Sequence, residues 1–138
     1  MEIASLAQLT AAHRRHDEVI AELIAASRRL AAGHPDNGDL DLVRGAVAYF
    51  EQDVPLHFLD EEGSLFPRLS TRRPELAETL ASLSAEHPTQ IEMHVAVIGA
   101  AAQFDSRGRS ASPAGAGKAL LEAAERLASA HHAHISRE

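Results

Sequence analysis

The sequence has no cysteine and no tryptophan, and it has only one tyrosine and four phenylalanines among its 138 residues. Without cysteine, disulfides, thiolate metal sites and cysteine nucleophiles are all excluded. With so few aromatic side chains, the core must be built from leucine, valine, isoleucine and alanine, which suits helices better than sheets. Because the length is that of one domain, we expect a single all-α domain spanning residues 1–138.

Positive charge is also scarce, since 13 basic residues face 20 acidic ones for a net charge of −7. This balance argues against nucleic acid or an anionic membrane surface as the main partner, because both require a basic face. No apolar run approaches the ~20 residues of a membrane span, and Met1-Glu2-Ile3 lacks the character of a signal peptide. We therefore expect a cytoplasmic protein that binds neither nucleic acid nor membranes.

Histidine, by contrast, is abundant, with nine copies against five phenylalanine and tyrosine residues together. Turn-forming residues at 33–38, 66–74 and 105–117 divide the chain into four segments, and Ser112-Pro113 suits the start of the last helix. In each segment apolar residues recur at spacings of three and four. Four amphipathic helices joined by short links predict an up-down-up-down bundle.

Each apolar stripe becomes polar at one end. A bundle packed only for stability would continue with leucine or isoleucine there, because buried imidazole and carboxylate groups cost free energy unless they are paired or bound to metal. In an up-and-down bundle these ends coincide, so the side chains should converge into one polar layer. The predicted layer comprises His13, His16, His57, Glu61, His87, Gln90, His94, His131, His134 and Glu138.

Two segments of this layer repeat one local pattern, His57-x-x-x-Glu61 and His134-x-x-x-Glu138. Four residues span about 6 Å along a helix and return to the same face, so each pair can reach a common point. Imidazole and carboxylate without thiolate favour iron, manganese or zinc. The His-Glu-x-x-His motif of zinc proteases is absent, and no glutamate is followed three residues later by histidine, which excludes the Glu-x-x-His pairs of ferritin-like bundles.

These motifs resemble those of the hemerythrin-like, or HHE cation-binding, family. The stretch at 57–67, His-Phe-Leu-Asp-Glu-Glu-Gly-Ser-Leu-Phe-Pro, is similar to the family's second-helix signature. Glu86-His87 resembles the third-helix element and residues 134–138 the fourth. His13-x-x-His16, with the Glu-Leu-Ile at 22–24, resembles the first helix of the iron-sulfur-cluster repair branch. The resemblance covers nearly the whole chain.

The resemblance implies a non-haem di-iron site inside the bundle, with both glutamates bridging the metals. The two iron ions would share an oxo or hydroxo bridge, with zinc or manganese as substitutes. Open coordination positions would remain for a small ligand such as O2, NO or peroxide. The implied metal ligands are His13, His57, Glu61, His87, His134 and Glu138.

Three further histidines leave choices open. His16 lies on the same core stripe as His13, and whichever of the two is not a ligand would supply a hydrogen bond near the metals. His94 and His131 also face inward, either as core histidines or as additional ligands.

The sequence departs from the family pattern at the third helix. Oxygen-carrying hemerythrins place two histidines four residues apart there, whereas Ile91 follows His87 at that spacing, which argues against reversible oxygen carriage. Pro88 directly follows His87 and disfavours a helical conformation at the ligand, so we expect a kink or an irregular turn.

From these observations we favour a binding or sensing module over an enzyme. The leading hypothesis is a di-iron protein that binds O2 or a related small molecule, or that responds to redox state. The alternative is iron-sulfur-cluster repair, or processing of NO or peroxide, at the same centre. A third hypothesis is a structural bundle with zinc or with no native metal.

Overall fold

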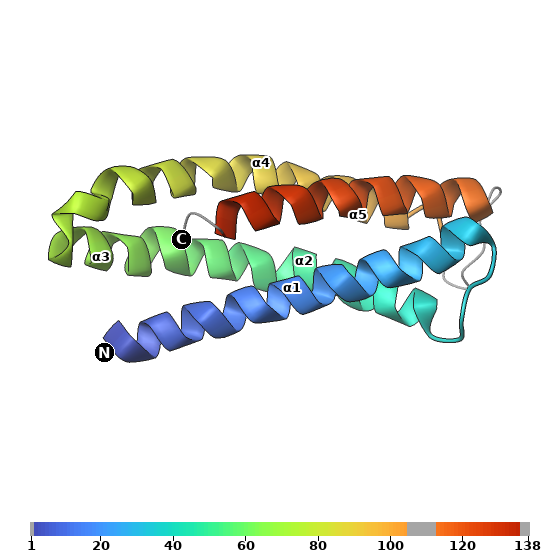
Figure 1. Ribbon diagram of the computed structural model, residues 1–138, viewed down its shortest axis with the longest axis horizontal. Coiled ribbons are helices and arrows are strands. Elements are labelled where there is room, and N and C mark those ends of the chain that lie inside the picture. The colour runs from blue at the N-terminus through green and yellow to red at the C-terminus, as the bar shows by residue number, and fades with distance from the viewer. Residues whose placement is uncertain (1, 105–112, 136–138) are drawn as a thin grey trace.

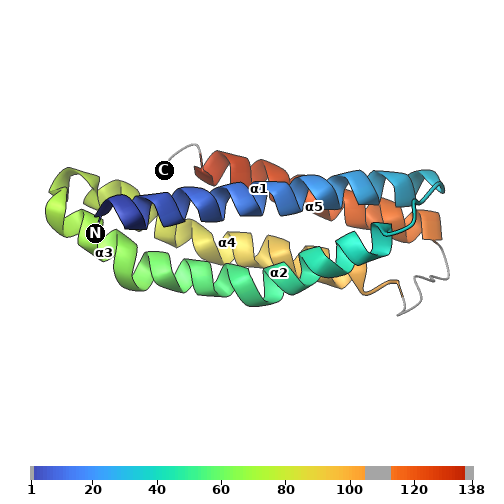
Figure 2. The ribbon, with the colours of Figure 1, turned by 90° about the horizontal axis from the view of Figure 1, so that it is seen from below.

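Four long helical segments run alternately up and down along one axis in the computed structural model, which describes residues 2–104 and 113–135 (Figure 1). Seen from below, α1 and α5 lie on one side and α2 and α4 on the other (Figure 2). The all-α, up-down-up-down bundle is therefore confirmed. Its elements are α1 (Glu2–Ala32), α2 (Asp39–Asp60), η1 (Glu61–Leu65), α3 (Phe66–Arg72), η2 (Pro74–Leu76), α4 (Ala77–Ala101) and α5 (Pro113–Ile135).

The turn between α1 and α2 lies where the sequence predicts it. Gly33 and Gly38 have φ angles of 79° and 92°, in the left-handed region that favours glycine. The buried carboxylate of Asp39 accepts hydrogen bonds from the Arg29 guanidinium, the shortest at 2.6 Å, and one from the backbone N–H of Asp36 at 2.7 Å. The bond from Arg29 is the main reason that the pKa of Asp39 is lowered. This ion pair fixes the corner at which the chain reverses.

The second segment differs from the prediction, because residues 66–72 form α3 and not a link. Helix α2 continues into a π-helical turn, η1. The backbone N–H of Phe66, which follows this turn, donates a hydrogen bond to the backbone carbonyl oxygen of Glu61. The chain then stays helical until Arg73, whose φ of −127° and ψ of 75° are not helical. A π turn widens the helix by one residue, and such turns occur often at functional sites.

For the other two segments the sequence predicts an irregular turn near Pro88 and a helix start at Pro113. Helix α4 remains α-helical through His87 and Pro88, so the expected irregular turn is absent. Pro88 is exposed, so water can reach the carbonyl that loses its helical N–H partner. Helix α5 begins at Pro113, as the Ser112-Pro113 pair predicts, so it already contains Gly117, the last residue of the predicted loop.

Gly117 allows α5 to lie very close to α1. A Cβ atom built there would lie 2.6 Å from the Ala31 nitrogen and 2.7 Å from the Leu30 carbonyl carbon. Any side chain larger than hydrogen would therefore push the two helices apart.

An apolar core fills the middle of the bundle and the half remote from α3. It is formed by the apolar stripes of α1, α2, α4 and α5, which include Leu23, Val43, Phe50, Val97, Leu120 and Leu127. A smaller cluster, with Leu65, Phe66, Leu80 and Leu83, packs α3 against the start of α4. Among the described helices, none combines the length and the apolar character needed to cross a membrane. The polar layer lies between the two apolar clusters.

Candidate metal centre

Glu61 lies at the centre of the polar layer, at the first residue of the π turn. Its carboxylate is 1% exposed and faces imidazoles from three helices. Oε2 lies 3.2 Å from Nε2 of His57 and 3.7 Å from Nε2 of His13. Oε1 lies 2.9 Å from Nε2 of His87. The first half of α1, the end of α2 and the first half of α4 thus meet at one carboxylate, in the half of the bundle that contains α3 (Figure 1).

These contacts have the separations of metal ligands. Nitrogen and oxygen ligands about 2.1 Å from one octahedral ion lie about 3.0 Å apart, close to the contacts of His57 and His87 with Glu61. None of the contacts is a well-directed hydrogen bond, since both Glu61 oxygens and Nε2 of His87 are buried without a hydrogen-bond partner. Unsatisfied buried groups are costly. A cation between them would satisfy all three atoms at once.

The electrostatics of the centre keep the carboxylate ionised. Burial by itself opposes ionisation of Glu61, but the facing imidazoles of His13, His57 and His87 outweigh it and hold the pKa of Glu61 below its ordinary value. For His87, burial lowers the pKa, and the carboxylates of Glu61 and Glu62 outweigh it, so that the pKa is raised. The centre therefore presents one negatively charged carboxylate surrounded by imidazole nitrogens that can ligate a metal.

Glu61 belongs to two groups of candidate ligands at once. In each group, one ligand atom from every residue lies within 4.8 Å of the others, and each group contains two imidazoles and one carboxylate. The first group is His13, His57 and Glu61, and the second is Glu61, His87 and His134. Two ions that share one carboxylate form a dinuclear centre, and two imidazoles with one carboxylate leave positions open on each ion.

Two further glutamates hold the outer nitrogens of the buried histidines. Nδ1 of His87 lies 2.8 Å from Oε1 of Glu62, and Nδ1 of His134 lies 3.3 Å from Oε1 of Glu86, so each imidazole donates its outer N–H to a carboxylate. In each ring the lone pair is then on Nε2, which faces the interior of the bundle, as in histidines that bind metals. These two roles are not among those predicted from the sequence, although Glu62 directly follows Glu61 and Glu86 directly precedes His87.

A family profile described as "Hemerythrin HHE cation binding domain" matches residues 4–138. The chain belongs to the hemerythrin family. No curated protein and no solved structure matches the chain. The family match and the two ligand groups together identify this hemerythrin domain as a candidate metal-binding bundle.

The remaining predicted site residues divide into three cases. His13 lies beside Glu61, whereas His16 lies one turn further along α1 and contacts His94. His94 and His131 are buried but belong to neither ligand group. Glu138, the predicted second bridging carboxylate, lies outside the described residues.

The polar layer of the hemerythrin domain therefore consists of two groups of side chains. His16, His94 and His131 form a second cluster, with ring centroids 5.1 Å apart for His16 and His94 and 4.0 Å apart for His16 and His131. Phe58 lies between the two groups, stacked on His87 at 4.1 Å with an edge towards His94 at 6.4 Å.

Access to the centre is uneven. The side chains of His13 and His57 are 14% and 18% exposed, whereas those of His87 and His134 are 2% and 3% exposed. The half of the centre that contains His13 and His57 is therefore partly exposed, and His87 and His134 in the other half are buried.

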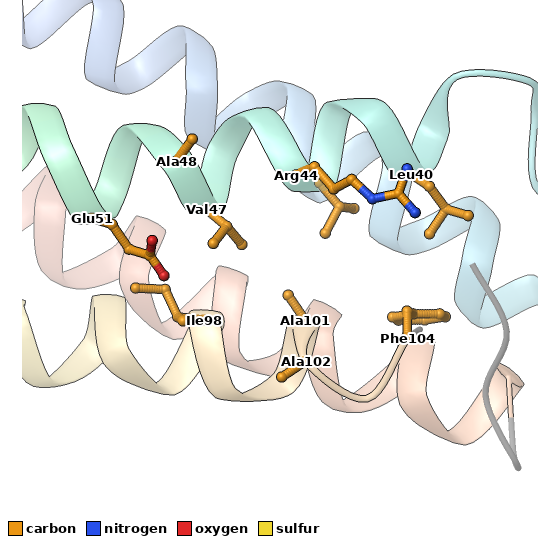
Figure 3. Close-up of a pocket in the computed structure, with 10 residues that line it drawn as sticks. Leu40, Arg44, Val47, Ala48, Glu51, Ile98, Ala101, Ala102 and Phe104 are labelled. Carbon is orange, nitrogen blue, oxygen red and sulfur yellow. The ribbon is translucent and has the colours of Figure 1, made fainter. Parts of the chain in front are cut away.

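A cavity of about 310 Å³ lies elsewhere, between α2 and α4. Figure 3 shows Val47 and Ile98 pointing into it from the two helices, with Arg44 and Glu51 along α2. Its lining residues are Leu40, Val43, Arg44, Val47, Ala48, Glu51, Ile98, Ala101, Ala102 and Phe104. None of them is a histidine, so this mainly apolar groove is separate from the metal centre.

Proposed function

We propose that this hemerythrin domain holds two iron ions and binds or senses a small molecule such as O2, NO or peroxide. The observation that carries the proposal is the position of Glu61, which is shared by two groups that each contain two imidazoles. Two imidazoles and a carboxylate with open positions is the ligand set of non-haem iron sites that react with O2. His13 and His57 would hold one ion and His87 and His134 the other, with Glu61 between them.

The chain's own residues suit a small ligand. The iron pair would supply redox chemistry and open coordination positions, while the protein supplies a rigid, mostly enclosed setting. Among the described ligands, His13 and His57 are the more exposed, and their side chains are less than a fifth exposed. Burial of this degree favours small molecules over organic substrates. Glu62 and Glu86 orient the enclosed imidazoles, which stabilises the ligand geometry before a ligand arrives.

The test is metal and ligand analysis of the full chain. Reconstitution with iron should give two ions per chain in the dinuclear centre, with the Mössbauer signature of a coupled ferric pair after oxidation. Addition of NO to the reduced protein should change its absorption spectrum at one equivalent per centre. Fewer than about one iron per chain, with no coupled pair, would refute the proposal. Loss of NO or peroxide well beyond one equivalent, abolished by His57→Ala, would instead show catalysis.

A further inference from the structure

We propose that His16, His94 and His131 form a second metal site, which binds one Zn²⁺ or similar borderline divalent cation through three imidazoles. The histidines come from α1, α4 and α5, and they are 2%, 2% and 3% exposed. The site is separate from the Glu61 centre and does not depend on which metal that centre holds.

The contact between His16 and His94 already has the spacing of two ligands of one ion. Their Nε2 atoms lie 3.0 Å apart. Two nitrogens bound to a tetrahedral zinc at 2.0–2.1 Å lie about 3.3 Å apart. In the structure a proton joins them: Nδ1 of His94 donates to the Gln90 carbonyl oxygen at 2.6 Å, so His94 Nε2 accepts from His16 Nε2–H. A cation can take this place once the His16 proton moves to Nδ1.

The outer nitrogens are arranged as in the Glu61 centre. Metal-bound histidines almost always direct the second ring nitrogen to a backbone carbonyl or a carboxylate. His94 does so with the Gln90 carbonyl. For His131, Nε2 lies 3.0 Å from Oδ1 of Asp17, which is on the exposed side of α1. The Gln90 carbonyl and the Asp17 carboxylate thus have the position that Glu62 and Glu86 have in the Glu61 centre. In both clusters an oxygen atom contacts the outer nitrogen of a buried histidine.

Unsatisfied buried atoms show that the cluster is incomplete without a ligand. Nδ1 of His131 makes no hydrogen bond, and neither does the oxygen or the nitrogen of the Gln90 amide; Gln90 is 2% exposed. Gln90 lies on the inner stripe of α4, between His87 and His94. Leaving such groups unpaired costs about 1–3 kcal/mol each. A cation, with a water held by the Gln90 amide, would satisfy them.

The protonation state also suits a metal. Burial lowers the pKa of His94 to about 4, so the imidazole is neutral near pH 7, the form that binds metals. Three neutral nitrogens exclude Mg²⁺ and Ca²⁺, which require oxygen ligands. His131 has to turn its ring towards the other two, since the described chain brings three ligand atoms within 4.8 Å only in the Glu61 groups. Rotation about χ2 is soft, and the exposed Asp17 carboxylate can follow Nε2 of His131 as the ring turns.

The experiment titrates metal-free, full-length protein with Co²⁺ and measures bound ions per chain. The wild-type protein should bind three ions, of which one gives the intense visible absorption of tetrahedral Co²⁺. Glu61→Gln should lose two ions and keep this absorption. His94→Leu should bind two ions and lose it, and His131→Gln, a milder change, should do the same if His94→Leu fails to fold. His34→Gln, which changes an exposed loop histidine, is the matched control and should bind three.

The outcomes separate this proposal from the dinuclear one. Two ions in the wild type, two in His94→Leu and none in Glu61→Gln would overturn the three-histidine site and leave the Glu61 centre intact. One ion that survives Glu61→Gln but not His94→Leu would support the three-histidine site and refute the pair. No bound ion in any variant would overturn both.

Discussion

Replacing Glu61 by glutamine tests whether the cluster around this carboxylate is a metal centre or only a set of buried ion pairs. The change keeps the shape of the side chain but removes the charge that faces three imidazoles. The metal-free variant should melt below the wild-type temperature, because the lowered pKa of Glu61 means that the ionised carboxylate, facing its imidazoles, stabilises the folded state. The metal-bound variant should lose most of its stabilisation.

The size of the loss follows from linkage. A cation at 100 times its Kd that binds only the folded chain adds about 2.7 kcal/mol, so two add about 5.4 kcal/mol. For 138 residues the unfolding entropy is roughly 0.29 kcal/mol/K, which makes each kcal/mol worth about 3.4 °C. The wild type should therefore gain about 18 °C from the pair, and Glu61→Gln should not. Any rise left in the variant should disappear when His94 is also replaced.

Melting followed by circular dichroism, with and without metal, measures this directly. Glu92→Gln, the same change at an exposed position of α4, is the control and should behave as wild type in both states. An unchanged metal-induced rise in Glu61→Gln would refute the reasoning. So would a metal-free variant as stable as the control, because the ionised carboxylate would then contribute nothing to the fold.

Three further predictions concern single residues. Gly117→Ala should lower the free energy of unfolding by about 1–3 kcal/mol, since the added Cβ would meet the α1 backbone. Gly45→Ala, whose Cβ has no atom within 4 Å, should raise it by about 0.5–1 kcal/mol. Chemical denaturation measures both changes. Asp39→Asn should lower the free energy of unfolding by about 1.5–3 kcal/mol at pH 7. Because the pKa of Asp39 is lowered, this difference between wild type and variant should be complete well above pH 3.8 and should disappear as the pH falls below it, which denaturation curves measure. Glu62→Ala should weaken metal affinity about 10–100-fold in competition titrations without changing the number of ions bound, because His87 loses its outer partner.

The family and the broad fold were accessible from sequence because both depend on local spacing. Apolar residues three and four apart define helices whatever their neighbours, and the glycines around residues 33–38 stop the first helix for reasons of backbone geometry alone. Polar residues at one end of every stripe then predict a common layer, since antiparallel helices bring those ends together. The irregular turn predicted at Pro88 is absent because local preference at one exposed position is weaker than the packing of the whole helix.

The tertiary structure alone decided how the layer divides. His13 and His16 are three residues apart and differ by about 60° around the helix, so both lie on the core stripe, and only the rotation of α1 against α2 places His13 beside Glu61. The π turn at Glu61, which lets the adjacent Glu62 reach His87, has no signature in local spacing. The close approach at Gly117 likewise depends on two segments more than eighty residues apart in sequence. Sequence periodicity therefore determined which residues face the interior, and helix rotation and register determined which of them meet.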